Sequence, residues 1–120
     1  MCFSVRKDIH NMTKVVIDPG ICNFVTSVEA VSEDGMEVTL KVKSGCVSIN
    51  EMFKKIGNTF DAYELCLAKL GDGPLYEYAK QNLPGHGGCP VIAGIVKAAE
   101  VECNLALPKD AKITFVNGKE

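Results

Sequence analysis

Apolar and polar residues alternate along two neighbouring stretches of the chain, residues 22–31 and 37–43. An alternation with a period of two is typical of a strand that buries one face. A shorter β-branched run at residues 14–18 ends at Pro19-Gly20, so it predicts a strand that stops in a turn. A last strand is predicted over residues 111–116, with the sequence AKITFV.

The two alternating stretches predict a long β-hairpin. The residues between them include Glu33-Asp34-Gly35, which fits a three-residue loop with glycine in the left-handed conformation. This loop sets Ala30 opposite Val38 and keeps the apolar face continuous, whereas a two-residue loop would bring a charged residue onto that face. The same register places Cys22 directly opposite Cys46.

After the hairpin the apolar period changes to 3.6, which predicts helices that cover the sheet. About four helices are expected: from Cys46 to Gly57, from Asp61 to about Leu70, from Pro74 onward, and after Pro90. The predicted fold class is therefore α+β, with an antiparallel sheet of about three to four strands in a single domain of residues 14–120. Residues 1–13 have no sustained period, and they predict a mobile N-terminal tail.

The composition favours a cytoplasmic protein that binds neither nucleic acid nor membranes. With 120 residues and 47% hydrophobic content, the chain can bury a core without disulfides or metal. Its net charge of -2 does not provide the basic surface that contacts phosphate backbones. No apolar run approaches the roughly 20 residues that span a bilayer, and residues 1–12 lack the apolar stretch of a secretory signal.

Six cysteines among 120 residues are the most distinctive chemical feature of the sequence. A reducing cytoplasm keeps thiols free, so the remaining explanations are metal ligation, redox chemistry and burial as small hydrophobic residues. No CxxC pair occurs, which excludes the zinc-ribbon and thioredoxin-like patterns. Cys22, Cys46 and Cys89 each follow a glycine by one or two residues, which suits a site where the backbone approaches an ion closely.

These three cysteines are predicted to form a metal site that holds zinc or an iron-sulfur cluster. Cys46 and Cys89 each precede a predicted helix, whose positive N-terminal end favours a thiolate. The fourth ligand is predicted to be Cys66 or His86. Cys66 lies within an amphipathic helix, where core packing is the favoured alternative. His86 lies in the glycine-rich loop before Cys89, where an exposed loop histidine fits equally well.

Three cysteine motifs occur in a fixed order: ICN at residues 21–23, KSGCVS at residues 43–48 and HGGC at residues 86–89. In this order they resemble the iron-sulfur cluster scaffold family, the NifU N-terminal or IscU type. The resemblance implies a scaffold-like α+β fold, a cluster held by the three cysteines, and iron-sulfur assembly proteins as partners. Where that family has an aspartate and a histidine beside its cysteines, this chain has Phe24 and Gly88.

Two further similarities concern other proteins. Gly45-Cys46 and Cys89-Pro90 resemble the TSCPD-type domain at the end of some ribonucleotide reductases. The chain as a whole is similar to a group of uncharacterised short proteins from anaerobic bacteria and archaea, a similarity that implies no activity. The leading hypothesis is therefore a metal-binding module that serves metal storage, cluster handling or structural locking.

Two other classes of function are compatible with the same residues. The first is a thiol-dependent redox or transfer enzyme in which Cys89 is the nucleophile and Cys22 or Cys46 resolves the intermediate. The sequence contains no recognisable hydrolytic set, Walker motif or dinucleotide fingerprint, so catalysis is the alternative and not the leading hypothesis. The second is a structural or interaction protein whose cysteines only fill a core.

Overall fold

The computed structural model describes residues 12–116 and confirms the predicted α+β fold. The strands in this part of the chain form one antiparallel sheet, in the order β1 (Thr13–Ile17), β2 (Thr26–Val31), β3 (Glu37–Ser44) and β4 (Thr59–Asp61). The helices there are α2 (Val47–Ile56), α3 (Ala62–Cys66), α4 (Pro74–Asn82) and α5 (Val91–Glu102). Residues 1–11 of the predicted tail lie outside the described residues, whereas Thr13 already belongs to β1 and not to a tail.

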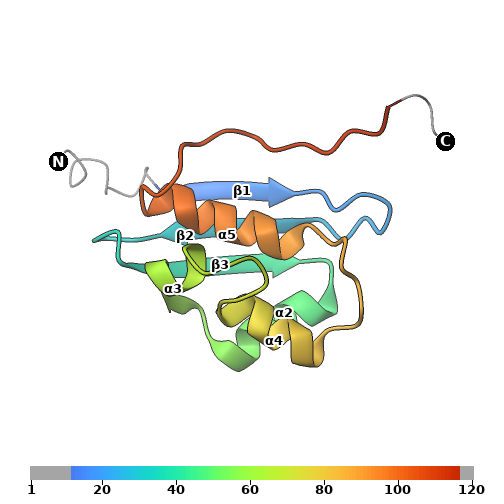
Figure 1. Cartoon of the computed structure of the whole chain (residues 1–120), viewed down its shortest axis with the longest axis horizontal. Coiled ribbons are helices and arrows are strands. Elements are labelled where there is room, and N and C mark those ends of the chain that lie inside the picture. Colours follow the sequence, from blue (N-terminus) through green and yellow to red (C-terminus); the bar gives the residue numbers. More distant parts are fainter. Residues whose placement is uncertain (1–11, 117–120) are drawn as a thin grey trace.

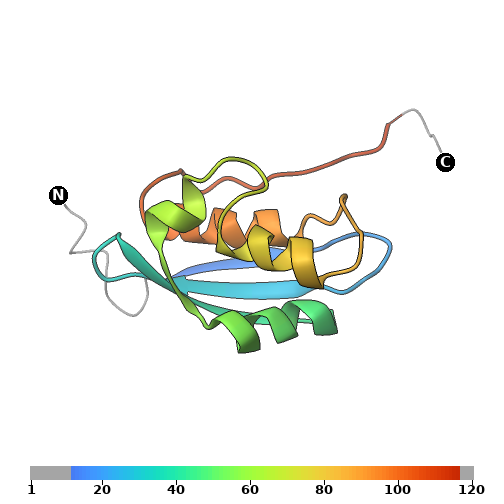
Figure 2. The same cartoon turned by 60° about the horizontal axis from the view of Figure 1, so that its bottom comes forward.

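The core lies between the apolar face of the sheet and the helices. Helix α5 lies across β1 and β2 (Figure 1), and α2 runs beside β3 (Figure 2). The largest fully buried side chains come from both layers and include Val28, Leu40, Met52, Leu75 and Ile95. Polar residues on the other face of the sheet are exposed, among them Lys14, Ser27, Thr39 and Lys41. The sheet therefore has the buried face and the solvent face that the alternation predicts.

The predicted hairpin between β2 and β3 forms, but its predicted register is wrong by two residues. Ala30 pairs with Leu40 and not with Val38, because the strands are joined by residues 32–36 and not by a three-residue loop. Side chains fasten this longer loop. The Ser32 hydroxyl accepts a hydrogen bond from the backbone N–H of Gly35 at 2.9 Å, and Gly35 has a left-handed φ of 76°. Asp34 also accepts from two backbone N–H groups that follow it.

A shift of two residues leaves every side chain on its predicted face, because the strand period is also two. The shift does change the relation between the two cysteines at the far end of the hairpin. The ladder continues with a hydrogen bond from Gly45 N to Val25 O at 3.1 Å, so the next position would pair Cys46 with Phe24. Cys22 is thus not directly opposite Cys46, as the predicted register required.

The region after α2 differs from the prediction in two ways. Thr59–Asp61 forms the short edge strand β4, which pairs with the start of β3 and was not predicted. Asp61 does cap α3, accepting hydrogen bonds from the backbone N–H groups of Tyr63 and Glu64. Helix α3 nevertheless ends at Cys66 and does not reach Leu70. The side chains that follow are exposed, so a longer helix would have no apolar face to bury.

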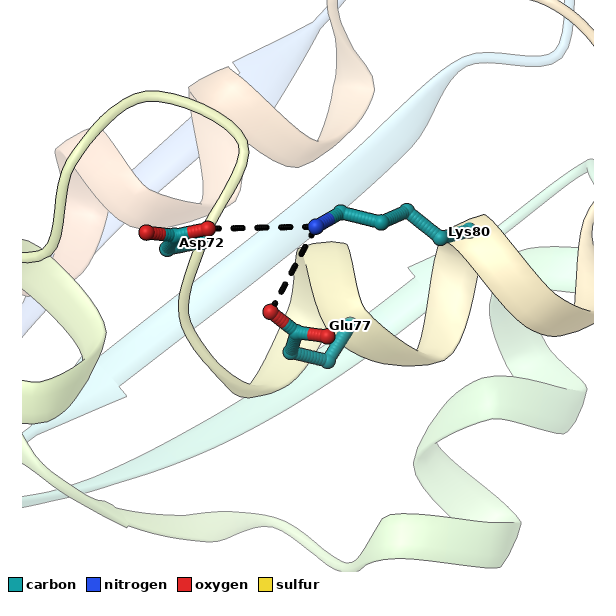
Figure 3. A network of polar contacts seen from close by, with 3 residues as sticks. All are labelled: Asp72, Glu77 and Lys80. Carbon is teal, nitrogen blue, oxygen red and sulfur yellow. Dashed lines mark hydrogen bonds and ion pairs between the residues drawn. The ribbon is translucent and has the colours of Figure 1, made fainter.

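Helix α4 begins at Pro74, as predicted, and an exposed ion-pair network connects it with the preceding loop. The Lys80 ammonium lies 3.8 Å from a carboxylate oxygen of Asp72 and 3.5 Å from one of Glu77 (Figure 3). All three side chains are more than half exposed. Such pairs contribute between about 0 and 1 kcal/mol, so packing of α4 onto the core has to hold this helix in place.

Residues 111–116 do not join the sheet, although a strand was predicted there. Their backbone has no assigned secondary structure, and all six side chains are exposed. The fourth strand of the sheet is β4 instead. No helix among residues 12–116 combines the length and the apolar character needed to cross a membrane.

Candidate metal site

Three cysteine-bearing segments lie at the same end of the sheet. They are the connection from β1 to β2 with Cys22, the connection from β3 to α2 with Cys46, and the connection from α4 to α5 with Cys89. Both views show these connections together, at the end opposite the loop that joins β2 to β3 (Figures 1 and 2). The sheet topology causes this arrangement, because β1 and β3 both end where β2 begins.

The segment around Cys22 is a tight double turn. The Asp18 carboxylate accepts a hydrogen bond from Gly20 N at 3.0 Å, and Gly20 O accepts one from Asn23 N at 2.9 Å. Gly20 and Asn23 both have positive φ values, of 99° and 61°. Glycine and asparagine tolerate this conformation better than other residues, so the local sequence determines where half-buried Cys22 lies.

Cys46 is the N-cap residue of α2, but its side chain makes no capping hydrogen bond. Ser44 and Asn50 hold the backbone there instead. Asn50 accepts from Ser44 N at 3.0 Å and donates to Ser44 O at 2.8 Å, while the Ser44 hydroxyl accepts from Cys46 N at 2.9 Å. Buried Thr26 shares a hydrogen bond of 2.7 Å with the same hydroxyl. The sulfur of Cys46 is therefore not needed to start the helix.

The segments of Cys22 and Cys46 touch through Phe24 and Gly45. A Cβ atom at Gly45 would lie 3.2 Å from Phe24 Cα, so only glycine allows this close approach without movement of the backbone. Phe24 and Gly45 adjoin the two cysteines, Phe24 at two residues from Cys22 and Gly45 next to Cys46. The contact thus keeps the two thiol-bearing turns together.

Cys89 directly precedes Pro90, the N-cap residue of the twelve-residue helix α5. Its backbone N–H donates to His86 O at 3.1 Å, which places His86 in the same turn. The His86 side chain is exposed and Cys89 is half-buried. The first turn of α5 packs against the end of β1, because a Cβ atom at Gly94 would lie only 2.6 Å from the Ile17 side chain.

Two helix N-termini therefore lie at the same end of the sheet as Cys22. The backbone N–H groups of the first turn of a helix carry partial positive charge, which favours anionic groups such as thiolates nearby. Apolar side chains are exposed around the thiols. They are Ile21, Phe24, Val25 and Val47, of which Ile21 is fully exposed.

Cys66 is not brought to this end of the sheet. It is the last residue of α3 and lies near Cys103 and Glu100, at the C-terminal end of α5. Cys103 is fourteen residues beyond Cys89, a distance of about 20 Å at the helical rise of 1.5 Å per residue. Burial, with smaller contributions from Cys103 and Glu100, raises the pKa of the Cys66 thiol to about 12. Cys66 is therefore a neutral thiol at physiological pH.

The three candidate thiols are not preassembled around an ion. Cys22, Cys46 and Cys89 form no disulfide. Across residues 12–116, no three His, Cys, Asp or Glu side chains are arranged as a group that could hold a metal ion. Bringing the three sulfurs of Cys22, Cys46 and Cys89 onto one ion therefore requires some movement of the segments that carry them.

The polar network behind Cys46 was not predicted from the sequence. Thr26 interrupts the apolar face of β2, and it is fully buried. A polar residue in an apolar position signals a buried hydrogen bond, because an unpaired buried hydroxyl is costly. This pattern could have identified Thr26 as a buried, hydrogen-bonded residue, but it does not predict which residue is its hydrogen-bond partner. Ser44 becomes the partner only through the observed register, in which Thr26 and Ser44 pair directly.

Comparison with known proteins identifies the family but no activity. The profile of a family of unknown function (DUF6951) matches residues 13–115, and the chain belongs to this family. The match begins at the first residue of β1 and extends beyond α5. No curated protein and no solved structure matches the chain significantly.

Proposed function

We propose that this member of the DUF6951 family binds zinc or an iron-sulfur cluster through Cys22, Cys46 and Cys89. The observation that carries the proposal is the gathering of their three segments at one end of the sheet, although the cysteines are far apart in the sequence. Thiolates are the preferred protein ligands of both zinc and iron-sulfur clusters. The start of α2 and the start of α5 add partial positive charge, which favours the ionised thiols.

Metal binding would pull the segment of Cys89 toward the other two thiols. Cys22 and Cys46 lie in turns fastened by hydrogen bonds and by the contact of Phe24 with Gly45. By contrast, residues 84–88 are all exposed, and the loop contains two glycines directly before Cys89. A loop of this kind can adjust at low cost in free energy, so the metal would order the α4–α5 connection as it binds.

His86 is the proposed fourth ligand, because it shares a turn with Cys89 and its exposed side chain can rotate toward the thiols. Cys66 is the weaker choice, since it lies near the opposite end of α5 and its raised pKa keeps it protonated. We also propose that iron-sulfur assembly proteins or other metal carriers of a reducing cytoplasm would dock on the exposed apolar side chains around the thiols.

Metal analysis of anaerobically purified protein tests the proposal. We expect about one zinc ion or one cluster per chain, the cluster being recognised by its iron and sulfide content and its visible absorption. The variants Cys22→Ser, Cys46→Ser and Cys89→Ser should each lose most of this metal. Cys66→Ser and Cys103→Ser are the matched controls, and both should retain it.

His86→Ala separates the fourth ligand from the other three. It should weaken zinc binding without abolishing it, because three thiolates remain. Full metal content in the triple variant of Cys22, Cys46 and Cys89 would refute the proposal. So would wild-type protein that takes up neither added zinc nor a reconstituted iron-sulfur cluster.

A further inference from the structure

The chain after α5 is extended and exposes large apolar side chains to solvent. Residues 106–116 run along the β1 side of the molecule (Figure 1), but they are set apart from β1 in the second view (Figure 2). Leu107, Ile113, Phe115 and Val116 are 64 to 87% exposed. The backbone of residues 106–116 makes no hydrogen bond to any other part of the described chain.

This segment nevertheless has the composition of a strand. Within residues 111–116, Ala111, Ile113 and Phe115 alternate with Lys112 and Thr114. Strand β3 has the same alternation, and there the apolar residues are buried while the polar ones face solvent. β-branched and aromatic residues favour strands because they pack well on a half-buried pleated surface. The segment thus needs a sheet edge and an apolar cover, and among the described residues it is paired with neither.

The segment belongs to the domain that defines the family. The family match extends to residue 115 and so includes most of residues 111–116. An appendage outside the domain would fall beyond the matched region. The unpaired strand is therefore part of the same unit as the sheet.

The sheet has one open edge of suitable length. Strand β1 lies at the end of the sheet order and pairs only with β2 among the described residues. It is five residues long, against six in residues 111–116. Exposed Lys14 and Val16 project on its solvent face, and α5 lies over its other face. A strand added here would bury its apolar side chains beside α5 and leave its polar side chains in solvent.

We propose that residues 111–116 of one copy add to the open edge of β1 in a second copy, and that the exchange is reciprocal. Within one chain the segment passes along the β1 side and yet makes no pairing with that strand. In two copies related by a two-fold axis, each unpaired segment would form backbone hydrogen bonds with the open β1 edge of the other copy, so neither segment and neither edge would stay unpaired. The proposal predicts an arm-exchanged homodimer with two five-stranded sheets, and it does not depend on metal binding.

The mass of the full-length protein in solution is the first test, measured by sedimentation equilibrium. Wild type should be a dimer, whereas the double variant Ile113→Asp/Phe115→Asp should be at least tenfold more dissociated. These side chains are exposed in the single chain, so the variant should still fold and unfold in one cooperative transition, with a melting temperature lowered only by the loss of the dimer contacts.

Leu70→Asp is the control, because Leu70 is also highly exposed but lies in the connection between α3 and α4. It should remain a dimer. The triple serine variant of Cys22, Cys46 and Cys89 should also remain a dimer, which distinguishes strand exchange from a metal bridge. A monomeric wild type, or a dimer that survives the changes at Ile113 and Phe115, would overturn the proposal.

Nuclear magnetic resonance on a mixture of isotope-labelled and unlabelled chains is the second test. Filtered nuclear Overhauser effects should connect residues 111–116 of one copy with β1 of the other. If those contacts occur only within one chain, the segment pairs with its own sheet and the exchange does not take place.

Discussion

Gly94 determines how closely α5 can approach the sheet. A Cβ atom at this position would lie 2.6 Å from both Cδ1 and Cγ1 of Ile17, which is closer than side-chain contacts allow. Ile17 is the last residue of β1 and is buried, so it has little room to give way. The first turn of α5, and with it Cys89, can lie near the β1–β2 connection because residue 94 has no side chain.

Replacing Gly94 with alanine should destabilise the protein, although alanine is the better helix former. The gain in helix propensity is at most about 1 kcal/mol, whereas overpacking a core costs typically about 1 to 3 kcal/mol. We expect a net loss of about 1 kcal/mol or more in the free energy of unfolding, measured with urea. Gly87→Ala is the control, because nothing lies within 4 Å of a Cβ atom there. Equal stability of the two variants would contradict the close packing at Gly94.

Cys66 should make the stability depend on pH at the alkaline end. Burial is the main cause that raises the pKa of this thiol from 9.0 to about 12. Below pH 9 the thiol is protonated in both states, so its titration does not affect stability. Between pH 9 and about 12 the unfolded chain loses this proton and the folded chain keeps it, which lowers the free energy of unfolding.

The comparison with Cys66→Ala isolates this effect from other groups that titrate at high pH. In the variant, the free energy of unfolding should fall less steeply between pH 9 and 12 than in wild type. Urea unfolding at several pH values in this range measures both slopes, and Cys103→Ala serves for comparison. Identical slopes in wild type and Cys66→Ala would show that Cys66 is not buried as described.

At the scale of elements, the sequence predicts long strands and helix starts well. The alternation in residues 37–43 predicts β3, and Asp61 and Pro74 mark the starts of α3 and α4 correctly. A period of two determines which residues share a face, but it does not distinguish registers that differ by two residues. The register of the hairpin therefore depended on loop bonds of Ser32 and Asp34 that the alternation does not reveal.

The other differences between predicted and observed elements also arise from features that the sequence period does not reveal. Strand β4 has three residues, which is too short to show a period. Residues 111–116 show a strand pattern, but a pattern reports only which side chains need burial and not which edge they join. After α3 the chain turns back against this helix, and a Cβ atom at Gly73 would lie 3.3 Å from Glu64 O. None of these contacts can be read from neighbouring residues alone.

At the scale of the whole molecule, the gathering of the three cysteine-bearing segments at one end of the sheet was predicted in outline. The positions of Cys46 and Cys89 before helices follow from local sequence, and the gathering of their segments with that of Cys22 follows from the hairpin and the last helix. The distance of Cys66 from them could not be predicted, because it depends on how α3 packs against the far end of α5. Periodicity predicts which side of a helix is buried, but it does not predict which element packs against that side.

Glu102 joins the far end of α5 to the sheet. Its side chain is almost fully buried. One carboxylate oxygen accepts a hydrogen bond from the Thr13 hydroxyl at 2.8 Å, and the other accepts one from Ser32 N at 3.1 Å. These bonds tie the last turn of α5 to the start of β1 and to the end of β2.

Glu102→Gln should therefore destabilise the whole domain. The amide of glutamine can accept from Ser32 N and donate to the Thr13 hydroxyl, but both bonds lose the carboxylate, and hydrogen bonds to a charged group are stronger than neutral ones, so the change should cost about 1 to 2 kcal/mol. Thermal or urea unfolding should show a loss in that range in a single cooperative transition. Glu100→Gln, on the adjacent half-buried surface of the same helix, should change stability by less than half as much. A loss confined to one part of the chain in hydrogen exchange would contradict this account.

The strand order of the sheet affects the order in which parts of the chain can fold. Strands β1, β2 and β3 each pair with their neighbour in the chain, so this part of the sheet needs only short loop closures. The turns of Cys22 and Cys46 can thus meet early during folding, by local pairing alone. Cys89 can reach them only when α5 docks across β1 and β2, after most of the chain has been synthesised. A nascent chain would therefore bring the thiols of Cys22 and Cys46 together first, and the thiol of Cys89 would join them only when α5 docks.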